Sequence, residues 1–174
     1  MPSPRRPIIL DVEASGLGAN SYPIEVGVVM ETGERFSRII KPEPGWTDWD
    51  PAAESLHQIS REVLATHGRS VAEVARELND LLANKIAYSD GWVVDKPWIS
   101  QLFHAAGMPI RFHLSPLELI LIEPQMSIWH DEKQAVEIAL AATRHRASHD
   151  AWIIQETFVR SRALVSTPIR SATS

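Results

Sequence analysis

The feature that most constrains the fold is a short apolar run near the N-terminus that ends in two acidic residues. The segment from Ile8 to Glu13, with the sequence IILDVE, has the length and apolar content of a buried β-strand. Side chains alternate between the two faces of a strand, so Asp11 and Glu13 share one face. Two carboxylates on one face of a strand are placed to share a bound cation.

A second group of titratable residues lies near the C-terminus, in the sequence HRASHD at 145–150. The apolar residues that follow it, between 152 and 158, have helical spacing. The segment therefore predicts a loop that leads into an amphipathic helix over 147–164. We expect this helix to carry Asp150 to the cation and to leave His145 at the rim of the site.

The composition limits both the class of protein and its chemistry. The chain has 174 residues, 44% of them hydrophobic, which is enough for one domain with a complete core. It contains no cysteine, so disulfides, thiolate metal sites and thiol nucleophiles are excluded. No stretch approaches a transmembrane helix or a signal-peptide core in length, and we expect a cytoplasmic protein without membrane contact. Residues 8–165 are treated as the single domain, with 1–7 and 166–174 as flexible termini.

The remaining periodicities predict a mixed sheet covered by helices. Alternating apolar residues and turn sequences indicate strands over 8–13, 24–30, 35–41, 86–88 and 110–114. Helices are expected over 51–57, 60–66, 70–82, 95–107, a short stretch from 115, 131–143 and 147–164. Consecutive strands followed by alternating strands and helices predict an α/β fold with about five strands.

A further candidate carboxylate is Asp95, at the expected start of the helix over 95–107. A negative charge at a helix N-terminus is favourable, and this helix start would face the ends of the strands. Taken singly, Asp95 and Asp150 are also explained as ordinary acids at helix starts, and Glu13 as a solvent-facing strand residue. The combination favours a site, because one topology brings all the acids to the same end of the sheet.

Together these motifs resemble the DEDDh branch of the DnaQ-like 3′-5′ exonuclease superfamily. The sequence DVEASGL at 11–17 resembles the first motif of that family. The sequence LHQIS at 56–60 resembles its I-H-G-I-[TS] segment, and HRASHD at 145–150 resembles its H-x-A-x-x-D motif. The resemblance covers about residues 8–160.

The second motif departs from the family pattern. The segment SDGWVVD at 89–95 lacks the Asn of the usual H-N-A-x-F-D sequence. Asp90 therefore stays an alternative to Asp95 as the carboxylate of this motif.

The resemblance implies a ribonuclease H-like fold and 3′-to-5′ release of nucleoside 5′-monophosphates with two Mg²⁺ or Mn²⁺ ions. A carboxylate-rich site is also chemically suited to binding these ions. In this scheme Asp11 bridges the ions, and Asp95 binds the leaving-group ion directly or through water. Glu13 and Asp150 bind the nucleophile-side ion. His145 takes the proton of the attacking water, a task that suits a side chain titrating near neutral pH.

The expected substrate is the single-stranded 3′ end of DNA, slightly preferred, or of RNA. The net charge of −5 argues against coating of a duplex, which needs many basic contacts. Adding the four charges of two divalent cations to −5 leaves −1, so the loaded protein repels phosphate less. Substrate contacts are expected from Glu13, Ser15, Gly16, Leu17 and His57. The family places an apolar residue at the position of Leu17 against the terminal base, and ordinary loop packing is the competing explanation.

Several alternatives stay open. One is an oligoribonuclease-like enzyme that trims RNA, and another is a catalytically silent nucleic-acid or protein-binding module, against which the complete set of acids argues. Trp46, Trp49 and Trp92 are candidates for base stacking, although loop tryptophans more often anchor loops to the core. The sequence QMSIW at 125–129 resembles the short peptide that docks on sliding clamps. A clamp or polymerase association is therefore a weak hypothesis, and core packing is the favoured explanation for the apolar residues of this segment. The oligomeric state is not indicated.

Overall fold

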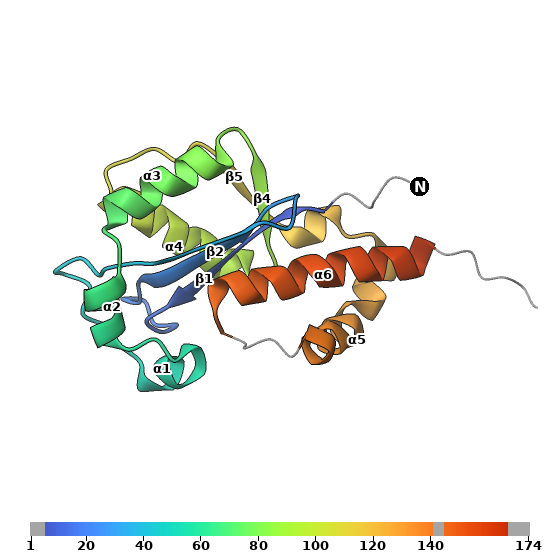
Figure 1. Cartoon of the computed structure of the whole chain (residues 1–174), viewed down its shortest axis with the longest axis horizontal. Coiled ribbons are helices and arrows are strands. Elements are labelled where there is room, and N and C mark those ends of the chain that lie inside the picture. The colour runs from blue at the N-terminus through green and yellow to red at the C-terminus, as the bar shows by residue number, and fades with distance from the viewer. Residues whose placement is uncertain (1–5, 141–144, 167–174) are drawn as a thin grey trace, which may run out of the picture.

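The centre of the protein is a five-stranded mixed sheet with helices on both faces (Figure 1). The structure is a computed structural model in which residues 6–140 and 145–166 are described. The strand order is β3-β2-β1-β4-β5. This confirms the predicted α/β fold with about five strands.

The meander of three strands comes first in the chain, as predicted, and the helices follow. The elements are β1 (Ile8–Ala14), β2 (Pro23–Val29), β3 (Arg35–Ile39), α1 (Pro51–His57), α2 (Arg61–His67), α3 (Val71–Leu82), β4 (Ile86–Ser89), α4 (Trp92–Ala105), β5 (His113–Pro116), a 3-10 helix (Leu117–Ile120), α5 (Glu123–Leu140) and α6 (Ala147–Ser166). β1, β2 and β3 pair antiparallel, whereas β4 pairs parallel with both β1 and β5.

Strand β1 divides two hydrophobic cores, because its side chains alternate between the faces of the sheet. Leu10 and Val12 belong to the core that α3 and α4 cover. Ile9 belongs to the core that α6 covers. Asp11 and Glu13 follow Ile9 at intervals of two residues, so both carboxylates lie on the α6 face, as the alternation predicted.

Helix α4 begins at Trp92, before the predicted start at Asp95. The Ser89 hydroxyl accepts a hydrogen bond from the Gly91 amide (3.0 Å) and donates one to the Asp95 carboxylate. These bonds close the turn between β4 and α4 and start the helix early. Asp95 lies in its first turn, which is the placement that the site requires.

Helix α5 also begins early, at Glu123 rather than at 131. Gln125 is fully buried and its Nε2 donates to the Phe158 carbonyl (3.3 Å) and to the Ser161 hydroxyl (3.1 Å) of α6. These contacts fix the first turns of α5 against α6. Because Gln125 is enclosed within the fold, a sliding-clamp or polymerase association through the segment 125–129 is not supported.

Strand β5 spans His113–Pro116 rather than 110–114. The Asn79 side chain of α3 holds the preceding segment, since it donates to the Pro109 carbonyl (2.9 Å) and accepts from the Arg111 amide (2.8 Å). The Arg111 amide is thus used by a side chain, and pairing with β4 starts two residues later.

The first described residues, Arg6 and Pro7, pack against helix α6. Arg6 and Pro7 belong to the segment expected to be flexible, yet Arg6 pairs with Glu156 and the Pro7 carbonyl accepts from Gln155 Nε2 (2.8 Å). Residues 1–5 and 167–174 lie outside the described residues, as does the end of the helix predicted over 131–143.

The first turn of α6 lies directly on β2 at Gly27. A Cβ atom at Gly27 would come within 2.2 Å of the Ala147 carbonyl carbon and of the Ser148 nitrogen. Only glycine therefore allows this close approach. Gly27 pairs with Asp11 across the β1–β2 ladder, so the contact brings the start of α6 beside the acids of β1.

We expect Gly27→Ala to lower the free energy of unfolding by about 1–3 kcal/mol, the usual cost of an overpacked contact. The measurement is urea denaturation followed by circular dichroism. Gly45→Ala is the matched control, because a Cβ there meets no atom within 4 Å. Equal stability of the two variants would show that α6 is not seated on Gly27.

Candidate active site

Four acidic residues and one histidine meet at one end of the sheet. Asp11, Glu13, Asp95 and His145 line a cavity of about 420 Å³. Asp150 joins them from the first turn of α6, where ligand atoms of Glu13, His145 and Asp150 all lie within 4.8 Å of one another. β1, α4 and the start of α6 therefore bring the predicted residues together.

The chain enters α6 through a strained turn that fixes His145 beside Asp150. His145 has a left-handed backbone with a φ of 61°, which is uncommon outside glycine. Its amide donates to the Asp150 carboxylate (2.9 Å), and the Asp150 amide donates to the Arg146 carbonyl (3.0 Å). His145 thus lies within the acidic group and not apart at its rim as expected.

Burial and mutual repulsion raise the pKa values of the clustered acids. Burial, followed by the Asp150 charge, raises the pKa of Glu13 to about 8. Burial raises the pKa of Asp95 to about 7, although the hydrogen bond from Ser89 opposes the shift. Burial and the charges of Asp95, Glu13 and Asp150 hold the pKa of Asp11 well above its usual range. Without a cation, the cluster therefore holds protons near neutral pH.

The donor set fits a hard divalent cation. Carboxylate oxygens are the ligands that Mg²⁺ and Mn²⁺ prefer, and a cation would relieve the repulsion that raises these pKa values. Glu13, His145 and Asp150 bring their ligand atoms close enough together to hold one ion. Asp11 and Asp95 are close enough for their charges to influence each other and Glu13.

The structure distinguishes the two candidates of the second motif. Asp95 is buried and lines the cavity with Asp11 and Glu13. Asp90 pairs with Lys133 (2.7 Å) and lines a different pocket, beside α5. The geometry therefore favours Asp95 over Asp90 as the acid of this site.

The walls of the cavity are largely apolar. Leu17, which is 83% exposed, lies at its edge, and further apolar side chains line it from α1 and α4: Ala52, Ala53, Leu56, Val94 and Trp98. Trp98 was not among the residues predicted for the site. A signal was present, because Trp98 follows Asp95 by three residues on one helix and so shares its face.

Each of the three tryptophans considered for base stacking contacts another residue of the fold through its indole ring. Trp46 stacks on Tyr22, with 5.4 Å between ring centroids. Trp49 Nε1 donates to the Glu54 carboxylate (2.6 Å), and Trp92 Nε1 donates to the Leu114 carbonyl (2.8 Å). These contacts support the anchoring explanation.

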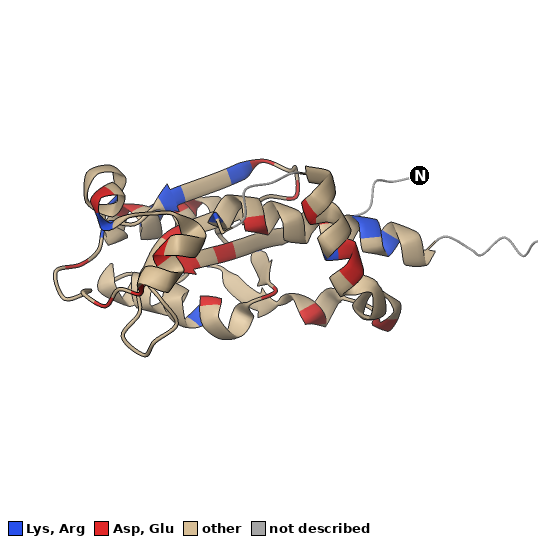
Figure 2. Ribbon diagram, turned by 90° about the horizontal axis from the view of Figure 1, so that it is seen from below, with Lys and Arg blue, Asp and Glu red and all other residues tan. Residues whose placement is uncertain are grey.

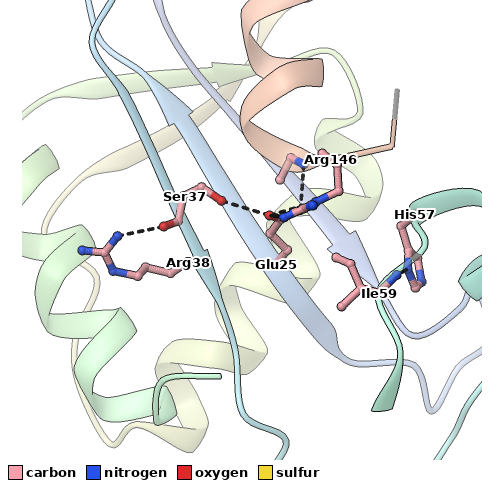
Figure 3. Close-up of polar contacts among 7 residues, drawn as sticks. Glu25, Ser37, Arg38, His57, Ile59 and Arg146 are labelled. Carbon is pink, nitrogen blue, oxygen red and sulfur yellow. Dashed lines mark hydrogen bonds and ion pairs between the residues drawn. The ribbon is translucent and has the colours of Figure 1, made fainter. Parts of the chain in front are cut away.

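His57 is a buried residue on the wall of the cavity. Its Nδ1 accepts a hydrogen bond from the Ile59 amide (3.1 Å; Figure 3), so a neutral ring carries its proton on Nε2. Burial lowers the pKa of His57, which favours this neutral form. Nε2 is buried and has no hydrogen-bond partner among the described residues.

Ser15 and Gly16, also predicted to contact substrate, support the turn after β1. The Ser15 hydroxyl is buried and accepts from the Tyr22 amide (3.1 Å), and Ser15 does not line the cavity. Gly16 does line it, and a Cβ there would lie 3.0 Å from the Asp50 Cβ. Asp50, which caps α1 by accepting from the Ala52 amide, also lines the cavity. The geometry supports a ligand-facing position for Gly16 and a structural one for Ser15.

The charges of the chain are interleaved over the fold. Figure 2 shows acidic residues on the sheet and on the helices around it, with basic residues between them. The sequence has 22 acidic and 17 basic residues. Among the described residues, no helix combines the length and the apolar character needed to cross a membrane.

The mixed sheet and its covering helices have the ribonuclease H-like exonuclease fold. Among solved structures, the chain is similar to E. coli exonuclease I in complex with a dA16 oligonucleotide, with a TM-score of 0.64 and 13% identity over 91% of this chain and 41% of that one. It is similar to the zinc-bound E. coli exonuclease I–ssDNA complex, with a TM-score of 0.59 and 14% identity over 91% and 39% of the chains. It is also similar to exonuclease I from Methylocaldum szegediense, with a TM-score of 0.61 and 14% identity over 91% and 39%.

These likenesses confirm the fold that the sequence motifs implied. The chain spans about two fifths of the length of the exonuclease I chains that it matches. No protein-family model matches the sequence, and no curated protein matches it significantly.

The raised pKa values predict that the metal-free protein loses stability as pH rises. The pKa of Glu13 is 4.5 in an unfolded chain and about 8 in the fold, and that of Asp95 is 3.8 and about 7. The folded state binds more protons across this window, so unfolding becomes easier from about pH 4 to about pH 8. The melting temperature in EDTA should fall by several degrees over that range.

The control for this prediction is Asp11→Asn, which removes one of the repelling charges and should flatten the pH dependence. Mn²⁺ should raise the melting temperature most at the alkaline end, since ligands must lose their protons to bind it. A melting temperature that is level with pH in EDTA would contradict the assigned coupling.

Proposed function

We propose that the chain is a metal-dependent 3′-to-5′ exonuclease that releases nucleoside 5′-monophosphates from single-stranded ends, with DNA slightly preferred over RNA. The observation that carries this proposal is the meeting of Asp11, Glu13, Asp95 and Asp150 with His145 beside one cavity. The fold shared with exonuclease I, whose solved complexes include single-stranded oligonucleotides, supports the same substrate class.

Two Mg²⁺ or Mn²⁺ ions are the proposed cofactors. Asp11 would hold both ions, Glu13 and Asp150 the ion on the nucleophile side, and Asp95 the ion on the leaving-group side. Bound in this way, such ions polarise the scissile phosphate and stabilise the attacking and leaving oxygens. The cluster supports the assignment, because burial and neighbouring acids raise the pKa values of Asp11 and Glu13, and a bound cation would favour their ionised forms.

His145 is the proposed general base. Its side chain lies within the group that contains Glu13 and Asp150, so it can reach a water molecule held at that point. The hydrogen bond from the His145 backbone amide to the Asp150 carboxylate fixes the position of His145. A base that is held in place can remove the proton of the attacking water without itself binding the phosphate.

The apolar walls would hold the terminal nucleotide. A cavity of about 420 Å³ falls within the usual range of small-molecule sites, about 300–1,000 Å³. Leu17 and Trp98 would offer apolar surface to a base, and His57 lies on the same wall of the cavity. A splayed single strand exposes its last phosphodiester to the acids, whereas a paired end does not.

The deciding experiment compares end-labelled DNA and RNA strands of the same sequence, and dinucleotides, with Mg²⁺ or Mn²⁺. We expect stepwise loss of 5′-monophosphates from the 3′ end, slowed by a 3′ block and not by a 5′ block. Asp150→Asn and Asp95→Asn should abolish or sharply reduce turnover, whereas Asp90→Asn should not. Preference for RNA or dinucleotides would favour the RNA-trimming enzyme. Absence of turnover would favour the catalytically silent binding module, and cutting of a circular strand would contradict an exonuclease.

We expect His145→Ala to lose about 10²- to 10⁴-fold in turnover while it retains Mn²⁺ and substrate binding, because only proton removal is lost. Single-turnover kinetics together with Mn²⁺ titration measure the two effects separately. His104→Ala, at the far end of α4, is the control. A loss of metal affinity as severe as that of Asp150→Asn would make His145 a ligand and not a base.

A further inference from the structure

An ion pair between a buried glutamate and a partly exposed arginine lies beside the candidate site, between β2 and the start of α6. Glu25 is 1% exposed and pairs with Glu13 across the β1–β2 ladder. A basic side chain pairs with it: Arg146 Nη2 lies 2.8 Å from Glu25 Oε1, and Arg146 Nε lies 3.1 Å from Glu25 Oε2. Figure 3 shows this pair linking the strand to the helix start.

The Glu25 carboxylate is also hydrogen-bonded by two further groups. The Ala147 amide, the first of α6, donates to Oε2 (3.0 Å), and the Ser37 hydroxyl of β3 donates to Oε1 (3.0 Å). A carboxylate from another strand thus takes the place of an N-cap residue for α6. An ion pair of this kind is weak evidence for net stability, whereas its several directed contacts restrict the helix start to one arrangement.

The residues that Glu25 holds are the immediate neighbours of the site. Arg146 and Ala147 directly follow His145, and the Arg146 carbonyl accepts from the Asp150 amide. Ala147, together with Ser148, lies directly against Gly27, where the helix meets the strand. The turn is therefore held from below by the sheet and from the side by the Glu25 carboxylate.

We propose that Glu25 and Arg146 act as positioning residues that hold His145 and Asp150 against Glu13. This inference rests on the proposed function, since it assigns a role within the same site. The pair keeps the left-handed turn at His145 and the first turn of α6 in one geometry. A helix start that shifts by about 1 Å would separate Asp150 from the acids of β1 and lower turnover markedly.

The first test is steady-state kinetics of Glu25→Gln and Arg146→Lys. Each keeps the approximate size of the side chain but removes the charged, two-point contact. We expect kcat to fall about 10- to 100-fold with little change in KM, the usual effect of losing a group that orients a ligand. Wild-type kcat in both variants would overturn the proposal.

Arg38→Ala is the matched control. Arg38 lines the same surface pocket as Arg146, but among the described residues its polar contacts are with Ser37 and Glu77 (2.6 Å) and not with α6. We expect wild-type kcat and KM for this variant. If Arg146 instead bound substrate phosphate, Arg146→Lys would raise KM with kcat nearly unchanged, and that result would also overturn the positioning role.

Two measurements do not depend on turnover. Hydrogen–deuterium exchange of the peptide over 145–151 should quicken in Glu25→Gln while the peptide over α3 stays protected as in the wild type. Mn²⁺ affinity should fall about 10-fold, as it does when groups that orient metal ligands are removed. Unchanged exchange at 145–151 would contradict the positioning role of Glu25 and Arg146, even if the protein had no nuclease activity. An inactive wild type with quickened exchange in the variant would contradict only the proposed function.

Discussion

The repulsion among the acids at the end of β1 is the constraint on which the local structure depends. Burial and neighbouring charges raise the pKa values of Asp11, Glu13 and Asp95 together. A chain without a firm scaffold would relax such a cluster by moving the side chains into water. Here β1 holds two acids, and the first turns of α4 and α6 hold one each on a fixed backbone. A bound cation would therefore relieve their repulsion.

The scaffold that holds the acids uses polar groups that themselves take no part in the proposed chemistry. The Ser89 hydroxyl bonds both the turn before α4 and the Asp95 carboxylate, which ties the helix start to its functional side chain. Glu25 ties the start of α6 to β2 in the same way, because its carboxylate accepts hydrogen bonds from Arg146 and from the Ala147 amide. Both arrangements make the position of an acid depend on a hydrogen bond from a neighbouring element.

The likeness to exonuclease I concerns the fold, at 13–14% identity over about nine tenths of this chain. At that identity few side chains coincide, and function is argued from the site itself. The cavity combines acids and His145 at one end with apolar walls that include Leu17 and Trp98. That division of polar and apolar surface suits a nucleotide, whose phosphate and base differ in the same way.

The sequence by itself determined that Asp11 and Glu13 share one face, since alternation along a strand is a local property. It also determined the order of strands and helices and the placement of Asp150 in the first turns of α6. Only the tertiary structure decided that His145 lies within the acids, that Asp95 and not Asp90 faces the cavity, and that Gln125 is buried. It also paired Glu25 with Arg146, which are 121 residues apart. Periodicity reports how one element meets its surroundings, whereas the seating of one element on another depends on contacts between residues far apart in the chain.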